Sequence, residues 1–148
     1  FTEFVPLPYI HMEAPLYRHG RSRKGPTYRE TLLMHAIARL ALHPYFKNIQ
    51  TSWVKNGRDG AAAFLNSGAN DLGGTLMNES ITRAAGTEHG QEFDPDEMES
   101  LIETMGRQPR MRNTFYQNVR RERQNLAYLA PPLLNQHIDP GESQKSVA

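Results

Sequence analysis

Polar and ionisable side chains gather within residues 68–90, around a pair of glycines. Asp71 is the most informative of them, because it lies in the short apolar and polar run of residues 69–72, which ends at Gly73-Gly74. A carboxylate at a strand end, near the start of a helix, can accept a substrate proton or hold an amine or hydroxyl group. Short polar side chains also cap turns and helices, so the sequence leaves both roles open. The neighbouring polar residues are Asn70, Asn78, Glu79, Arg83, Glu88 and His89.

Further candidates lie elsewhere in the chain. His11 follows the first expected strand, where a site residue of an α/β protein would lie, but it is equally compatible with an ordinary loop. Gln50 and Ser52 alternate with less polar neighbours, which suits either a cavity for a polar ligand or a plain edge strand. His35 has no second ligand at zinc-like spacing, so we expect it to be solvated. Gly73-Gly74 lacks the flanking residues of a phosphate-binding loop.

The sequence contains no cysteine. Disulfides, thiolate nucleophiles and cysteine-bound metal clusters are therefore excluded within this chain. We expect no metal site in it. The absence of cysteine also fits a cytoplasmic protein.

Short strands and helices must position these side chains. Strand-forming residues predict strands at residues 1–5, 47–54 and 69–72. Hydrophobic spacing predicts helices at residues 27–43, 58–66, 75–86 and 94–105.

Two of the predicted helices have clear start signals. Thr27 with Glu30 forms a capping box, and Asp94 is an N-cap followed by a proline. The expected buried residues of the first helix are Leu33, Ile37, Leu40 and Ala41. Those of the last are Met98, Leu101, Ile102 and Met105.

Helices that alternate with short strands predict an α/β fold with parallel pairing through right-handed crossovers. Three such units cannot close a barrel, and they would leave exposed strand edges. The chain also begins at Phe1 rather than Met. We therefore expect a piece of a longer protein, or part of an assembly that supplies the missing strands. Residues 117–148 are expected to form an irregular or disordered tail.

Composition adds weaker limits. The chain has 148 residues, enough for one ordinary domain. Its net charge of +1 gives no indication of nucleic acid or of an acidic membrane surface as a partner. It contains no apolar run of the eighteen or so residues that a membrane span needs.

Three stretches in order carry a resemblance to a known family: TEFVPLPYIHMEAPLY, IQTSWVKNG and GANDLGGTLMNESITRAAGTEHG. Residues 1–116 resemble the C-terminal portion of FO synthase, a radical S-adenosylmethionine enzyme, and more closely the half that joins tyrosine to ribityl-diaminouracil. Related enzymes are aminofutalosine synthase and dehypoxanthine futalosine cyclase. The resemblance implies that residues 1–116 form about the last three strand–helix units of a (β/α)8 TIM-type barrel.

The resemblance also implies cofactors and partners. In the family, a 4Fe-4S cluster on a Cys-x-x-x-Cys-x-x-Cys loop cleaves S-adenosylmethionine, and the resulting radical attacks tyrosine. This chain has no cysteine, so we expect the ligands in a missing N-terminal barrel half and no activity from the fragment alone. The expected partners are that half, on the same chain or on a second subunit, with tyrosine and ribityl-diaminouracil as substrates.

By position, the resemblance places the proposed contacts at strand ends and in the loops above them. The adenosyl contacts would be Val5, Pro6 and Leu7. The substrate contacts would be His11, Gln50, Ser52, Asn70 and Asp71. The catalytic candidates are Asp71, Glu79 and His89.

Two other hypotheses stay open. The chain could belong to a menaquinone-pathway relative with the same barrel and a different acceptor. It could also be a non-catalytic ligand-binding or assembly module that lacks the cluster half.

Overall fold

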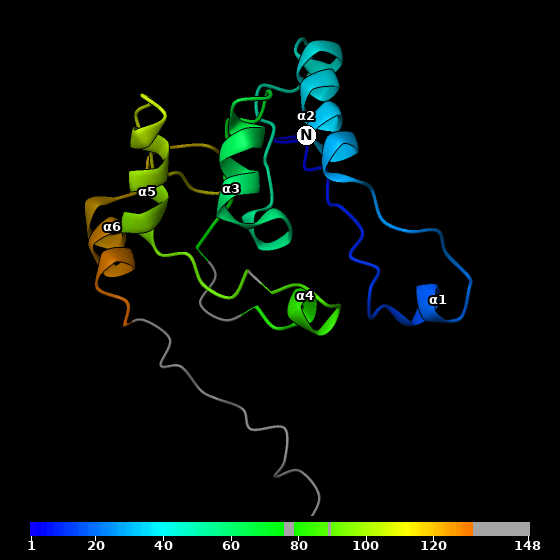
Figure 1. Cartoon of the computed structure of the whole chain (residues 1–148). Helices are drawn as coiled ribbons and strands as arrows, with labels where there is room; N and C mark the ends of the chain where they lie inside the picture. The colour runs from blue at the N-terminus through cyan, green and yellow to red at the C-terminus, as the bar shows by residue number, and fades with distance from the viewer. Residues whose placement is uncertain (76–78, 89, 132–148) are drawn as a thin grey trace, which may run out of the picture.

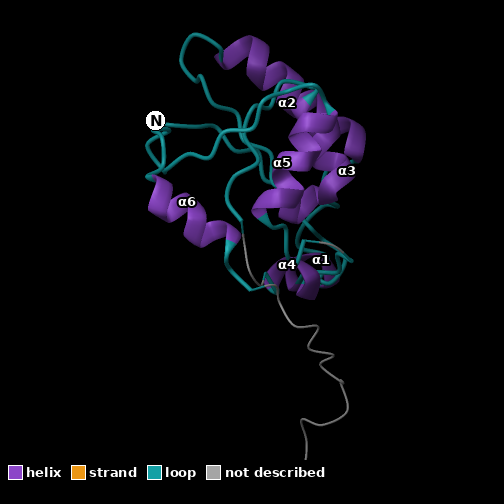
Figure 2. Cartoon of the chain, turned by 90° about the vertical axis from the view of Figure 1, so that its left-hand side faces the viewer, coloured by secondary structure: helices purple, strands orange, loops and turns teal. Residues whose placement is uncertain are grey.

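The computed structural model describes residues 1–75, 79–88 and 90–131. Helices and loops make up this part of the chain, and Figure 2 shows no strand in it. The helices of Figure 1 are α1 (Pro15–Arg18), α2 (Tyr28–Leu42), α3 (Trp53–Leu65), α4 (Ile81–Ala84), α5 (Pro95–Thr104) and α6 (Arg121–Tyr128).

Helix α3 occupies the centre of the structure. It packs between α2 and α5, and α6 contacts the outer side of α5 (Figure 1). The hydrophobic core forms where α3 and α5 meet the extended segments that precede and follow α3. Its buried members are Ala38, Ile49, Trp53, Val54, Ala61, Leu65, Ala69, Leu72, Phe93 and Met98.

The three expected strands meet only through single bridges. Phe4 pairs with Ile49, and Gln50 pairs with Asp71, both in the parallel direction. The order and direction of the three segments agree with the prediction, but regular strands are absent from the described residues. One bridge per pair is too little to propagate a ladder.

Helix α3 begins within the segment that was predicted to be a strand over residues 47–54. Ile49, Thr51 and Trp53 are all buried, but a short alternating run does not determine where the extended segment ends. The Trp53 indole N–H donates to the Gly74 carbonyl at 3.1 Å, and this hydrogen bond ties the first turn of α3 to the segment that follows the helix. Gly57, at φ 68°, then interrupts the helix with a kink.

The start of α2 confirms the predicted capping box. Thr27 Oγ1 accepts from the Glu30 N–H at 3.2 Å, and the Glu30 carboxylate accepts from the Thr27 N–H at 2.7 Å. The predicted buried face was wrong. Leu33, Ile37 and Leu40 are exposed, as is Ala41.

The face of α2 that is buried carries Thr31, His35 and Ala38. His35 was expected to be solvated, but it is fully buried and stacks on the Phe64 ring at 4.7 Å. Its Nδ1 lies 2.8 Å from the Thr31 carbonyl. Burial lowers the pKa of His35, because an apolar setting disfavours the charged imidazole.

The remaining elements follow the predictions in part. Asp94 Oδ1 accepts from the Glu97 N–H at 2.7 Å, and the predicted apolar face of α5 packs on the core. The helix predicted at residues 75–86 is helical only over α4 in its described part, and Gly86 follows it at φ 106°. Met77 and Asn78 lie outside the described residues.

Helix α6 lies in the segment that was expected to be irregular. Residues 132–148 of that segment lie outside the described part of the chain. The division of the chain at residue 116 stays a prediction.

Candidate functional site

Asp71 is the centre of a polar network that the three bridged segments build together. Its side chain is 7% exposed, and its Oδ1 accepts from the Gly73 N–H at 2.8 Å. The bridge to Gln50 places the two residues side by side. We call Glu3, Gln50, Asp71, Arg112 and Tyr116 the Asp71 network.

Arg112 reaches all three segments from the C-terminal side of the chain. Its Nη2 forms an ion pair with Asp71 Oδ2 and lies 3.5 Å from Glu3 Oε2. The same nitrogen donates to Gln50 Oε1 at 3.3 Å. The guanidinium also lies over the Tyr116 ring, 4.1 Å from its centroid, a favourable cation–π geometry.

Tyr116 completes the network. Its hydroxyl donates to Glu3 Oε2 and to Asp71 Oδ2. Burial first, and then these hydrogen bonds to carboxylates, raise the pKa of the Tyr116 phenol, so the phenol remains a proton donor at neutral pH. The backbone of Tyr116 has φ 61°, in the left-handed region that non-glycine residues seldom adopt.

A tight turn holds Tyr116 in this conformation. Asn113 Oδ1 accepts from the N–H groups of Phe115 and Gln117, both at 2.9 Å. Arg112 and Asn118 form an antiparallel bridge across the turn. Residues 112–118 are therefore a closed turn that projects the Arg112 and Tyr116 side chains onto the carboxylates.

The structure brings Gln50 and Asp71 together, but it turns Asn70 the other way. Asn70 Oδ1 accepts from Arg39 Nη2 at 2.7 Å and from the Ile49 N–H at 2.8 Å. Successive side chains of an extended segment point to opposite faces, so Asn70 faces α2 while Asp71 faces the network.

The other predicted residues lie outside the network. The His11 ring packs edge-on against Tyr17 at 4.8 Å. Ser52 precedes α3, where its carbonyl accepts from the Asn56 side chain at 2.8 Å. The Glu79 carboxylate accepts from the Thr82 N–H at 3.0 and 3.1 Å and so caps α4.

The proposed adenosyl contacts follow the first bridge. Val5 and Pro6 are half-buried and Leu7 is exposed, in the segment directly after Phe4. His89, the remaining catalytic candidate, lies outside the described residues.

Sequence reasoning missed Glu3, Arg112 and Tyr116 as members of the site. Arg112 is separated from Asp71 by 41 residues and Tyr116 from Glu3 by 113. The available signal was the spacing of Arg112 and Tyr116 on either side of Asn113, a residue that favours turns.

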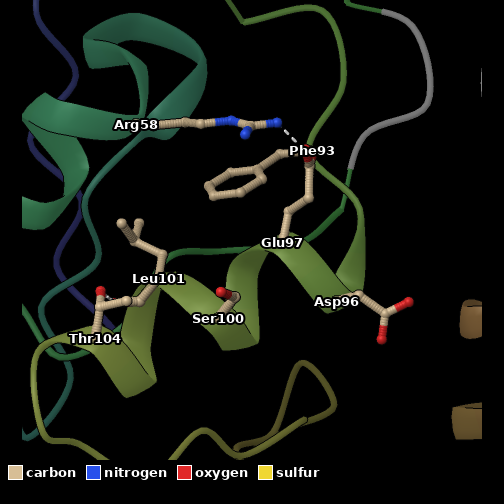
Figure 3. Close-up of a pocket in the computed structure, with 7 residues that line it drawn as sticks. All are labelled: Arg58, Phe93, Asp96, Glu97, Ser100, Leu101 and Thr104. Carbon is tan, nitrogen blue, oxygen red and sulfur yellow. Dashed lines mark hydrogen bonds and ion pairs between the residues drawn. The ribbon is translucent and has the colours of Figure 1, made fainter.

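A cavity of about 430 Å³ opens between α3 and α5 (Figure 3). It is lined by Arg58, Phe93 and one face of α5, and it shares no residue with the Asp71 network. Arg58 forms an ion pair with Glu97 at its edge and lies 4.8 Å from the Phe93 ring centroid (Figure 3). This cavity and the Asp71 network are thus separate features.

The chain does not fit an iron–sulfur cluster. It has no cysteine, and the described residues contain no group of three His, Asp or Glu side chains placed to hold a metal. No helix in the described residues is both long and apolar enough to cross a membrane.

Comparison with known proteins gives one family match. The model of the CofH/MqnC C-terminal region matches residues 1–125. The match therefore continues past residue 116 into α6.

Individual relatives agree with that match. The chain is 52% identical over 127 residues to an FO synthase of Streptomyces avermitilis, covering 86% of this chain and 15% of the relative. It is 52% identical over 116 residues to an FO synthase of Mycobacterium leprae, covering 78% and 13%.

A third relative is named 5-amino-6-(D-ribitylamino)uracil–L-tyrosine 4-hydroxyphenyl transferase and comes from Methanopyrus kandleri. It is 48% identical over 120 residues, covering 81% of this chain and 32% of the relative. The chain thus spans a third or less of each of these relatives. No solved structure matches the chain.

Proposed function

The chain belongs to the CofH/MqnC C-terminal region family, and on that premise we propose that it is the C-terminal part of a radical S-adenosylmethionine transferase. The whole enzyme would transfer the 4-hydroxyphenyl group of L-tyrosine to 5-amino-6-(D-ribitylamino)uracil. The 48% identity to a relative named for that reaction carries the proposal.

We propose that the chain supplies the last three strand–helix units of a (β/α)8 barrel. The support is the parallel order of the bridges, in which residues 49–50 lie between Phe4 and Asp71. Helix α2 connects the first two extended segments and α3 the last two, as the crossover helices of a parallel barrel do. Strands from outside this chain would extend the bridges into ladders.

Within that barrel, Gln50 and Asp71 would contact the polar part of a substrate. The Gln50 amide can donate and accept, and the Asp71 carboxylate can accept hydrogen bonds from hydroxyl or amine groups. Asp71 is also our proposed proton acceptor. Substrate contacts by His11, Ser52 and Asn70, and adenosyl contacts by Val5, Pro6 and Leu7, stay predictions, as do catalytic roles for Glu79 and His89.

The iron–sulfur cluster of such an enzyme would be held by cysteines outside this chain. The residues of this chain would then bind and orient the substrate and shield the interior of the barrel from water. The part of the enzyme that precedes this chain, on the same or on a second subunit, is the proposed partner.

The test is an anaerobic assay of the full-length enzyme that contains this chain. We expect the enzyme, together with the partner half of FO synthase, to convert tyrosine and 5-amino-6-(D-ribitylamino)uracil into the deazaflavin FO. The product is detected by its fluorescence. Turnover only of futalosine-type substrates would instead assign the menaquinone-pathway function, which the MqnC part of the family description makes the second candidate. Absence of both activities, with stable folding, would favour a binding module.

Asp71→Ala tests the site within the same assay. We expect it to abolish FO formation while 5′-deoxyadenosine release from S-adenosylmethionine continues. An unchanged FO yield would remove Asp71 from the substrate contacts.

A further inference from the structure

The Asp71 network contains more negative than positive side chains. Glu3 and Asp71 share two donors, the Arg112 Nη2 and the Tyr116 hydroxyl. Gln50 is neutral, so Arg112 is the one cation that these contacts bring to the carboxylates. Two carboxylates that share a site repel each other unless a cation stands between them.

The same contacts also fix geometry. Arg112 Nη2 touches an acceptor on each of the three bridged segments, and its ring partner Tyr116 touches two of them. Gln50 is confined from the other side, because a Cβ at Gly73 would lie 2.8 Å from Gln50 Nε2. The positions of Gln50 and Asp71 are therefore set by the 112–118 turn on one side and by Gly73 on the other.

We propose that Arg112 and Tyr116 are positioning residues for the transfer reaction: they hold the Gln50 and Asp71 side chains in the positions that bind substrate. This inference rests on the proposed function. It assigns the 112–118 turn a role in the site, although nothing requires the turn to touch the substrate.

A positioning role predicts a split between kinetic constants. Displacing a substrate-orienting group by about 1 Å can cost roughly 10²-fold in rate. Arg112→Gln should therefore lower kcat/KM for FO formation by about 10²-fold, mostly through kcat, while release of 5′-deoxyadenosine persists. Tyr116→Phe keeps the ring beneath Arg112 and loses only the hydroxyl, so we expect a fall of about tenfold.

The matched variants make the test specific. Arg112→Lys retains the charge without the planar fork, so it should restore only part of the rate. Arg121→Gln removes the same charge from an exposed position at the start of α6. It should leave the rate unchanged.

The outcomes separate this inference from the proposed function. If the full-length wild type makes no FO, the proposed function fails. The melting temperature still reports the network, because Arg112→Gln removes the cation between two carboxylates and should melt at a lower temperature than Arg121→Gln. A wild-type rate in Arg112→Gln would overturn the inference. If Arg112→Gln does not fold, Arg112→Lys and Tyr116→Phe supply the same comparison.

Discussion

Asn70 and Asp71 are neighbours in sequence, but their side chains point in opposite directions and bind different partners. Asp71 faces Arg112 and Tyr116, whereas Asn70 turns towards α2 and binds Arg39 and the Ile49 backbone. Its Nδ2 also donates to the Lys47 carbonyl at 3.3 Å. Asn70 therefore ties the second and third extended segments to α2.

Replacing Asn70 should lower stability more than replacing an asparagine with fewer hydrogen bonds. Asn70→Ala leaves the Ile49 N–H without its acceptor and deprives the Arg39 guanidinium of one partner. We expect a loss of about 1–3 kcal/mol in the free energy of unfolding of the full-length enzyme, measured by denaturant titration. Asn66→Ala, at an exposed position with only a 3.4 Å contact to Arg107, should change it by less than about 0.5 kcal/mol. Equal losses would contradict the role given to Asn70.

His35 makes stability depend on pH. Burial lowers its pKa in the folded state, so the unfolded chain binds a proton more readily. Stability is then fully present above the unfolded pKa of about 6.5 and declines as the pH falls below it. In a melting series from pH 7.5 to 5, His35→Asn should show a smaller decline than wild type. His43→Asn, at an exposed histidine, should match the wild-type slope, and a similar slope in all three proteins would argue against His35 as the titrating group.

At the scale of elements, α2 depends on its first turn. The Thr27 and Glu30 side chains bind each other's backbone N–H groups, which satisfies donors that the helix itself leaves free. Thr27→Ala should cost about 1 kcal/mol of stability. Thr27→Ser keeps the hydroxyl and should stay within about 0.5 kcal/mol of wild type in the same denaturant titration. A loss of equal size in both variants would place the effect outside the cap.

At the scale of the whole molecule, the outer face of α2 is apolar and exposed. Ile37 is 57% and Leu40 82% exposed, and residues 1–5 pair on one side only within the described contacts. In the proposed barrel, the preceding strand–helix unit of the full-length enzyme would cover both features.

That arrangement predicts that lysines on the outer face of α2 destabilise the enzyme, whereas a lysine after α6 does not. Ile37→Lys with Leu40→Lys should destabilise the full-length enzyme by roughly 2 kcal/mol or more, because the lysines would enter a packed interface. Leu129→Lys, at a leucine 77% exposed after α6, should have almost no effect. Thermal melting of the wild type and the two variants tests this prediction. An unchanged melting temperature in the double variant would mean that no other part of the enzyme packs on the outer face of α2.

Local signals predicted the parts of the fold that local contacts determine. The starts of α2 and α5 were found because Thr27, Glu30 and Asp94 act within three residues of their partners. The buried face of α2 was predicted wrongly because Leu33 and Ile37 belong to an apolar stripe that is exposed, whereas Thr31, His35 and Ala38 form the buried face. Gln50 and Asp71 were predicted from their strand-end positions. Arg112 and Tyr116 could not be, because their partners lie far along the chain.

The contact between Glu3 and Tyr116 spans 113 residues. During synthesis, Glu3, Gln50 and Asp71 leave the ribosome first, and for a time the two carboxylates can meet without their cation. Closing so long a loop comes late in folding, because its entropy cost precedes its contacts. The site would thus be completed only after Tyr116, which lies 113 residues after Glu3, has been made. A chain that stops before Arg112 would retain most of the core while its two carboxylates repel each other.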